Sequence, residues 1–369
     1  MNGDLILVIV VAAALAFDFT NGFHDTANVV ATSISTRAMA PKLAVGFAAV
    51  LNFAGAFISL EVAATVAQGI VDADLITPLI VFAGLIGAIA WNLATWYFGL
   101  PSSSSHALIG GVVGAAFVAE GAQAVIGSGL VGKVIVPAIV APILAFAVAG
   151  LGILFTYRLV GRLRPGPVNE GFRLGQLVSG GMLAIAHGTN DAQKTMGVIT
   201  LALVANGNIA SDDFHVPSWV VVSSAAAIAL GTYVGGWRII KTMGSRIHKM
   251  DAAQGYAAQG AGAAVILASS HVGFPLSTTH TISGAVIGAG AAKRLSAVRW
   301  GVAGNIVVAW VLTLPAAAAI GGLTYGFSRL FGTGSAGAIV VSAVILAGAA
   351  FLFARRVQRG PTATAPAEG

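Results

Sequence analysis

The amino-acid sequence predicts an all-α integral membrane protein, a helical bundle of about 10–12 transmembrane segments. Of its 369 residues, 57% are hydrophobic and only 9% are charged, whereas a soluble domain carries about a quarter charged residues. Three charge-free stretches each exceed the roughly 20 residues that cross the hydrocarbon core as a helix: Leu75 to Leu100, Val134 to Tyr157 and Trp300 to Phe327. The alternating strands of about 10 residues that build a membrane barrel are absent from the pattern.

The apolar pattern places eleven crossings, and the shorter ones are expected to be half-helices or re-entrant segments. They are predicted near 5–36, 43–66, 78–99, 104–119, 131–157, 176–205, 217–237, 253–271, 277–291, 300–327 and 330–354. The first is a long element interrupted by polar residues. Its apolar start is interpreted as retained, because it lacks the basic flank and the clear cleavage site of a signal peptide. The 48 glycines suit close helix packing in lipid.

The basic residues predict the orientation in the membrane. Sixteen of the 19 lysines and arginines form five clusters: Arg37/Lys42, Arg158/Arg162/Arg164/Arg173, Arg238/Lys241/Arg246/Lys249, Lys293/Arg294/Arg299 and Arg355/Arg356/Arg359. The positive-inside rule makes these segments cytoplasmic, with the amino terminus outside and the carboxyl terminus inside. Their distribution also explains the net charge of +6 without a nucleic-acid partner. The absence of cysteine excludes disulfides, thiolate metal sites and cysteine nucleophiles.

Two motif pairs indicate an internal repeat. Pro101 to His106, followed by Gly110 and Gly114, matches Pro275 to His280, followed by Gly284 and Gly288. The segments ending at Asp25 and Asp191 share only Gly-x-x-Asp but recur in the same order. Each half holds five crossings, so the second half is predicted to be inverted, which is a common plan of transporters with a site near the midplane. The expected divisions are a first repeat over 1–157, a short basic cytoplasmic loop over 158–173, a second inverted repeat over 174–327, an additional transmembrane helix over 328–354 and a disordered basic and polar tail over 355–369.

Asp25 and Asp191 are the first candidate functional residues, because ionisable side chains inside a membrane span are costly and usually functional. Their carboxylates, with the amides of Asn28 and Asn190, suit a coupling cation. The alternative is a structural role, for which Asp191 has a partner in Lys194 at helical pairing distance. Lys194 is either that salt-bridge partner or a cation that offsets the charge of a bound anion.

The hydroxyl clusters form the second candidate set: Ser103, Ser104, Ser105, Ser277, Thr278 and Thr279. Each cluster follows a proline and opens a new helical run, where free N–H groups and the helix dipole form an anion site. Two inverted copies would aim two such helix starts at one point. The alternative is ordinary N-capping, which uses the same residues.

Several further residues have two interpretations. His106 and His280 either relay a proton or are packed structural residues. The paired glycines favour close helix packing. Asp18 and Glu61 either bind a coupling cation or lie near an interface. For Glu61, which is close to the outer end of its predicted span, the interface position is favoured. The sequence contains no Gly-x-x-x-x-Gly-Lys-Ser/Thr motif, so ATP-driven pumping by this chain is not expected.

At these residues the sequence resembles the PiT family of inorganic phosphate transporters, over nearly the whole chain except its tail. The stretches that carry the resemblance are Phe17 to Asn28, Gly99 to His106, Ala186 to Gly197 and Gly273 to Thr281. The resemblance implies a transporter and not an enzyme, which imports phosphate by H⁺ or Na⁺ symport without a cofactor. It implies cation and phosphate roles for Asp25, Asn28, Asn190 and Asp191, and phosphate contacts for the hydroxyl clusters.

The resemblance leaves other properties open. Similar proteins include sulfate permeases and proton-coupled carriers of metal–phosphate complexes. The sequence leaves the oligomeric state open, with a homodimer as one alternative. Asp25 and Asp191 are metal ligands only if the coupling ion is Na⁺. The segment between the halves is short, as it is in bacterial relatives, which implies that the protein lies in a bacterial plasma membrane. A remote alternative, an intramembrane aspartyl protease whose aspartates share a proton, leaves the hydroxyl clusters without a role.

Overall fold

Helices make up most of the chain in the computed structural model, which describes residues 2–210, 213–332 and 334–358. They are α1 Asn2–Ser35, α2 Pro41–Gly55, α3 Glu61–Gln68, α4 Pro78–Phe98, α5 Ser104–Glu120, α6 Gly127–Gly129, α7 Val136–Val160, α8 Pro165–Ala205, α9 Ser218–Val234, α10 Trp237–Lys241, α11 Ala252–His271, α12 Thr278–Lys293, α13 Trp300–Arg329 and α14 Ser335–Gln358. Over these ranges the sole β-type pairing is an isolated bridge between Val71 and Val125. The predicted helical class is confirmed.

Four described helical segments are long and apolar enough to cross a membrane: Asp4–Ser35, Pro78–Phe98, Gly127–Val160 and Trp300–Arg329. A fifth is formed if α9 and the segment Trp237–Arg246 are counted as one span, bent by 59° at its break. The remaining predicted crossings correspond to shorter or more polar helices, so the number of crossings stays a prediction. The predicted crossing over 43–66 is divided between α2 and α3, because residues 56–60 leave the helix.

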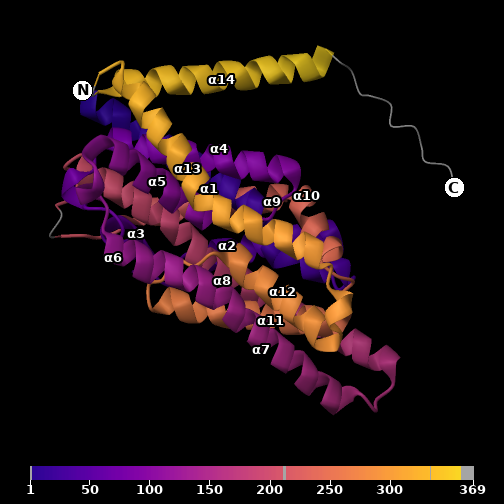
Figure 1. Ribbon diagram of the computed structural model, residues 1–369. Coiled ribbons are helices and arrows are strands. Elements are labelled where there is room, and N and C mark those ends of the chain that lie inside the picture. The colour runs from indigo at the N-terminus through magenta and orange to yellow at the C-terminus, as the bar shows by residue number, and fades with distance from the viewer. Residues whose placement is uncertain (1, 211–212, 333, 359–369) are drawn as a thin grey trace.

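Two short helices lie at equivalent places in the two halves of the chain. α5 packs between α4 and α13, while α12 packs between α11 and α7 (Figure 1). A Cβ atom at Gly114 would overlap the carbonyl oxygen of Ala318 in α13, and one at Gly288 would overlap that of Phe146 in α7. Glycine is required at these contacts because the two backbones touch. The packing role predicted for the paired glycines is therefore confirmed.

α1 and α8 form the centre of the bundle. α1 packs against α9, α8 packs against α2, and the two central helices contact each other. A Cβ atom at Gly22 of α1 would meet the backbone of α9, and one at Gly188 of α8 would meet the backbone of α2. These matching contacts support the predicted repeat, whereas the inversion of one half relative to the other stays a prediction.

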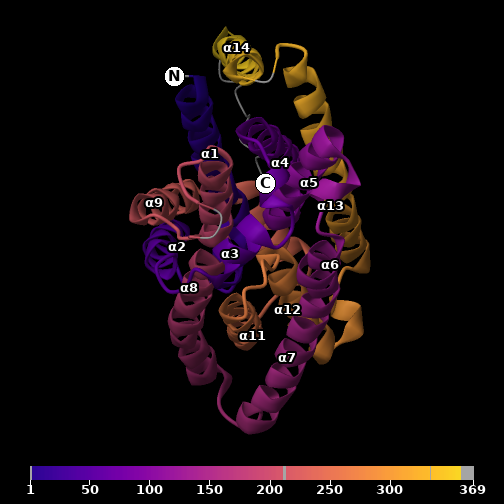
Figure 2. The same ribbon diagram turned by 90° about the vertical axis from the view of Figure 1, so that its left-hand side faces the viewer.

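Two expected divisions differ from the observed helices. The predicted loop over 158–173 is reduced to residues 161–164, because α7 continues to Val160 and α8 begins at Pro165. The two helices project from the bundle and meet at its far end (Figure 2). α14 lies near the start of α1 and extends away from the bundle (Figure 1). It runs to Gln358, so the expected tail begins inside a helix, and residues 359–369 lie outside the described residues.

Candidate functional site

The first turns of α5 and α12 meet the middle of α1 and α8 inside the bundle. The Ser103 hydroxyl accepts a hydrogen bond from the His106 backbone N–H at 3.1 Å, and the Ser277 hydroxyl accepts one from the His280 backbone N–H at 3.2 Å. These are N-caps, since each satisfies a donor that the helix start leaves free. The capping interpretation therefore describes one serine of each cluster.

The hydroxyls that follow these caps contact the two central aspartates. Ser104 donates to Oδ2 of Asp25 at 2.6 Å, and Thr279 is 3.3 Å from Oδ1 of the same carboxylate. Thr278 lies between the two acids, 3.5 Å from Oδ2 of Asp25 and 3.3 Å from Oδ2 of Asp191. All five side chains are 1% exposed or less. Four elements distant in sequence thus converge on one buried polar centre.

Lys194 completes the centre on the side of α8. Its ammonium lies 2.5 Å from Oδ1 of Asp191 and donates to the Ser105 hydroxyl at 2.6 Å and to the Leu276 carbonyl at 2.8 Å. Because Lys194 is fully buried, these three partners take the place of water around its ammonium group. It is a salt-bridge partner, as one of the two predicted roles requires, and it also reaches the hydroxyl cluster at the start of α5.

The two predicted asparagines have different surroundings. Asn28 donates to the Thr279 hydroxyl at 2.8 Å and so belongs to the centre. Asn190 donates instead to Ser270 at 2.8 Å and to the Phe274 carbonyl at 3.2 Å, at the connection between α11 and α12. The structure brings Asn28 to the aspartates and directs the Asn190 amide towards the chain that precedes the second helix start.

Two histidines at the centre are not predicted by the sequence reasoning. Nδ1 of His24 lies 2.7 Å from Oδ1 of Asp25, and Nε2 of His187 lies 3.3 Å from Oδ2 of Asp191. Asp25, His187 and Asp191 offer ligand atoms that all lie within 4.8 Å of one another. Each histidine belongs to one of the two aspartate motifs, so these motifs were the feature of the sequence that could have identified them. A cation held here would contact both halves of the chain.

The histidines that were predicted as a proton relay lie elsewhere. The rings of His106 and His280 contact each other at 4.7 Å, and His280 also stacks on Trp310 at 4.1 Å. Among the described residues, neither ring hydrogen-bonds to Asp25 or Asp191. Their relay role stays a prediction, while their mutual packing agrees with the structural interpretation.

A stripe of polar side chains follows one face of α1 and was also missed. Its members are Asp18, Asn21, Asp25, Asn28, Thr32 and Ser35. They alternate at spacings of three and four residues, which places them on one side of a helix. Most are buried, although α1 is apolar over most of its first half. The central site therefore lies midway along this polar stripe, and the i, i+3, i+7 spacing in the sequence could have revealed the stripe.

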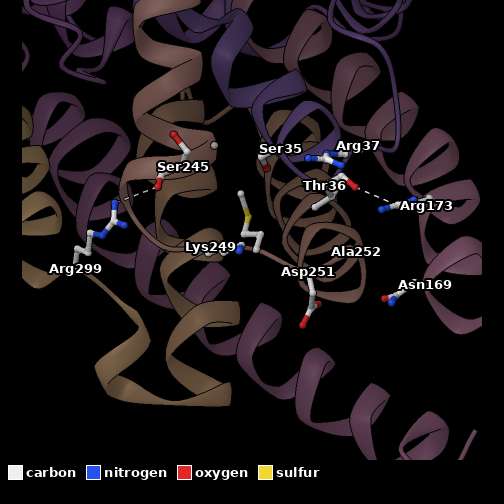
Figure 3. Close-up of a pocket in the computed structure, with 12 residues that line it drawn as sticks. Ser35, Thr36, Arg37, Asn169, Arg173, Ser245, Lys249, Asp251, Ala252 and Arg299 are labelled. Carbon is white, nitrogen blue, oxygen red and sulfur yellow. Dashed lines mark hydrogen bonds between the residues drawn. The ribbon is translucent and has the colours of Figure 1, made fainter. Parts of the chain in front are cut away.

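The carboxyl-terminal end of this stripe lines a basic cavity of about 570 Å³. Its lining includes Ser35 at the end of α1 and Thr36 just beyond it, together with Arg37, Arg173, Lys249, Arg299 and Asp251. Figure 3 shows these side chains around the opening, with the Arg173 side chain directed to the Thr36 carbonyl. Four basic residues against one acid make this cavity attractive to anions.

Hydrogen bonds between helices separate the cavity from the centre. Gln259 of α11 accepts from Ser179 of α8 at 2.9 Å and donates to Ser33 of α1 at 2.7 Å. Thr36 donates to Gln176 at 3.0 Å. These bonds tie three helices together between the aspartates and the basic cavity.

Comparisons with known proteins agree with this geometry. The model of the "Phosphate transporter family" matches residues 21–167 and 162–321. A "Probable low-affinity inorganic phosphate transporter" of Mycobacterium tuberculosis (strain CDC 1551 / Oshkosh) is 54% identical over 346 residues, which is 94% of this chain and 83% of the relative. Proteins with the same name in Rhizobium meliloti and Bacillus subtilis are 51% and 44% identical, each over 87% of this chain and 96% of the relative.

A solved structure titled "The sodium-dependent phosphate transporter" has the same fold, with a TM-score of 0.79 at 24% identity, and the match covers 88% of this chain and 99% of that one. The protease alternative fails, since the relatives are transporters and Lys194 pairs with one of the aspartates that would have to share a proton. The matched ranges include both aspartates, both hydroxyl clusters and most of the helices around them. The chain is therefore a membrane-spanning member of the phosphate transporter family.

Proposed function

We propose that this chain imports inorganic phosphate by cation symport through alternating access. The observation that carries the proposal is the convergence of two helix starts on two buried aspartates, one from each half of the chain. Helix starts stabilise an anion and carboxylates stabilise a cation, so the site suits simultaneous binding of both. The opposite charges neutralise each other, which lowers the cost of moving them through a medium of low dielectric constant.

The two carboxylates favour phosphate over sulfate as the anion. Sulfate has no proton near neutral pH and can only accept hydrogen bonds, as can an ionised carboxylate. Phosphate retains at least one O–H at the same pH and can donate it to Asp25 or Asp191. A sulfate ion would meet two unsatisfied negative groups unless cations intervened. The sulfate permease alternative thus has no specific support in the site.

Asp25 is the favoured contact for the coupling ion. It accepts hydrogen bonds from hydroxyls and has no lysine or arginine partner among the described residues, whereas Asp191 already has Lys194. The carboxylate and the neighbouring hydroxyl oxygens suit Na⁺, and the carboxylate alone suits a proton. Either cargo ion would occupy the same place.

The release route leads along α1 to the basic cavity. The basic residues of the cavity belong to the clusters that the positive-inside rule places in the cytoplasm, together with the carboxyl terminus. Phosphate that leaves the centre would pass the hydrogen bonds of Gln259 and Gln176 and enter a positive vestibule. Opening this side while closing the other constitutes the alternating step.

The test is uptake of labelled phosphate by the purified protein in proteoliposomes. An inward Na⁺ gradient at equal pH and an inward H⁺ gradient without Na⁺ are the two driving conditions, and Asp25→Asn is the control. We expect accumulation above the equilibrium level under one condition, none with the variant, and little competition from excess sulfate. Uptake that only equilibrates phosphate would indicate a passive channel and reject symport. Repeating the assay with a divalent-metal chelator tests whether the cargo is a metal–phosphate complex.

A further inference from the structure

The basic cavity receives one residue from each of four separate basic clusters of the sequence. These residues are Arg37, after the end of α1; Arg173, within α8; Lys249, before α11; and Arg299, before α13. The positive-inside rule accounts for basic clusters in each cytoplasmic segment, but it does not require that one member of each should reach the same place. Figure 3 shows Arg37 and Arg173 on one side of the opening and Arg299 on the other. All four side chains are exposed, so a dissolved anion can reach them.

No acidic side chain neutralises these four charges. Among the described residues, none of the four forms a salt bridge. The one acid of the lining, Asp251, instead accepts a hydrogen bond from the Tyr157 hydroxyl at 2.8 Å and pairs with Lys293 at 3.1 Å. Both partners lie outside the lining. Like charges around one cavity repel each other, and an anion bound among them removes that cost.

Backbone carbonyls hold two of the guanidinium groups in place. Nε of Arg173 donates to the Thr36 carbonyl at 3.2 Å. Nη1 of Arg299 donates to the carbonyl oxygens of Ser245 and Arg246, at 3.3 and 3.4 Å. These bonds leave other N–H groups of each guanidinium available, and such groups bind phosphate oxygens in pairs. A side chain that is already held loses less freedom when a ligand binds.

Arg37 has a backbone conformation that costs stability. Its φ of 59° lies in the left-handed region, where it is the sole non-glycine residue among those described. It follows α1 at the position where many helices carry glycine, and other residues pay about 1 kcal/mol or more there. Its side chain forms no hydrogen bond within the described part of the chain, yet it lines the cavity. Strain of this kind is typical of functional positions, and a ligand would account for an arginine here.

The size and the lining of the cavity indicate the class of ligand. Its volume of about 570 Å³ falls in the range of roughly 300–1,000 Å³ that is usual for small-molecule pockets, and it is far larger than a single phosphate ion. No aromatic side chain in the lining could stack on a nucleobase. The apolar side chains of the lining are those of Met250 and Ala252, which are too few for an acyl chain. The cavity therefore suits an extended, hydrophilic anion.

We propose that this cavity is a regulatory site for linear polyphosphates, anions in which several phosphate groups are joined in a chain. The four basic groups would contact successive phosphates along the chain. The inference rests on the proposed function, because the cavity lies on the proposed release route. A bound chain would block this route and tie the ends of α1 and α8 to the segments before α11 and α13. Uptake would then fall when such chains accumulate on the cytoplasmic side.

The binding test is calorimetric titration of the purified full chain in detergent with inorganic triphosphate. We expect one triphosphate per chain, bound at least tenfold more tightly than sulfate. Arg173→Gln and Lys249→Gln should each weaken binding about tenfold, which corresponds to about 1.4 kcal/mol. Arg294→Gln is the matched control, because this exposed arginine belongs to the same basic cluster as Arg299 but does not line the cavity. An equal loss in the control would reduce the effect to general charge attraction and overturn the inference.

Two further variants separate this site from folding and from the central site. Arg37→Gly should weaken triphosphate binding about tenfold without lowering the melting temperature, because glycine adopts the left-handed conformation without strain. A lower melting temperature with unchanged binding would assign Arg37 a structural role and reject its part in the site. Asp25→Asn should bind triphosphate as the parent chain does, and loss of binding there would place the ligand in the central site instead.

Phospholipid headgroups offer similar phosphate chemistry, so dihexanoyl phosphatidylglycerol is titrated in parallel. Tighter binding of this lipid, lost in the same variants, would assign the cavity to a membrane lipid and reject polyphosphate.

The regulatory role is tested in proteoliposomes of neutral lipid. Triphosphate enclosed with the cytoplasmic face of the protein should lower gradient-driven phosphate uptake several-fold, and Arg37→Gly should need about tenfold more triphosphate for the same fractional inhibition. Binding without inhibition would reject the regulatory role. If the chain transports phosphate but binds no triphosphate, this inference fails alone. If it binds triphosphate with the expected variant pattern but carries no phosphate, the proposed function fails while the binding site stands.

Discussion

The two central aspartates occupy corresponding places in the two halves but are neutralised in different ways. Asp191 has a lysine 2.5 Å away on its own helix. Asp25 has hydroxyls from both helix starts and His24, but no lysine or arginine among the described residues. The comparison indicates that one half supplies its own positive charge, whereas in the proposed symport the other half would receive that charge from the cargo.

The largest effect is expected from Lys194→Ala. Removing one member of a buried ion pair costs about 3–5 kcal/mol, because the remaining charge is left without compensation. We expect a large loss of folded protein, measured as the melting temperature and as the monodisperse yield in detergent. Lys293→Ala is the control, since its ion pair with Asp251 is 56% exposed on the lysine side and should contribute at most about 1 kcal/mol. Equal effects of the two changes would contradict the buried-pair interpretation.

Asp25→Asn should abolish transport without a large loss of stability. The substitution keeps the shape and leaves no lysine unpaired, so the protein should remain folded while gradient-driven uptake falls to the background level. Asp191→Asn should abolish uptake too, but with a loss of stability of about 3–5 kcal/mol, since Lys194 is then unpaired. The measurement is uptake per correctly inserted molecule together with the melting temperature. Near-normal transport by either variant would exclude a role in cation binding.

Ser104→Ala combined with Thr278→Ala tests the helix starts. Each lost hydrogen bond is worth about 1 kcal/mol, so the pair should raise the KM for phosphate about tenfold or more with a smaller change in maximal rate. Ser103→Ala with Ser277→Ala is the comparison, because these serines cap the helices and should affect stability more than affinity. An unchanged KM in the first pair would rule out the opposed helix starts as the anion site.

The smallest effects are expected from substitutions of the two asparagines, and the two substitutions should change different kinetic constants. Asn28→Ala removes a donor to the Thr279 hydroxyl and should raise the KM for phosphate several-fold, as expected for one hydrogen bond of about 1 kcal/mol. Asn190→Ala breaks contacts to the chain before α12 and should lower the maximal rate more than the affinity. Kinetics of phosphate uptake for the two variants provide the test, and identical profiles would remove the distinction.

The sequence reveals the helical class and most of the residues that meet at the centre, because hydropathy and motif spacing are local properties. It does not reveal which way each side chain points. The four serines at 102–105 are alike in sequence, yet Ser103 caps the helix, Ser104 reaches Asp25 and Ser105 reaches Lys194. That distinction depends on how α5 is rotated against α1 and α8.

Tertiary packing also decides features that local sequence leaves open. The interruption between α2 and α3 lies within an apolar run without proline, so hydropathy predicts a single crossing there. His24 directly precedes Asp25 and His187 lies four residues before Asp191, but only the meeting of α1 and α8 makes His187 part of a three-residue ligand group.

The packing of α7 and α13 has a consequence for biogenesis. α7 is encoded in the first half yet packs on α12, and α13 is encoded in the second half yet packs on α5. Each of the two helices whose first turn forms the site thus packs against a helix from the opposite half of the chain. We therefore expect the first helix start to reach its final packing only after the nascent chain has been synthesised through α13.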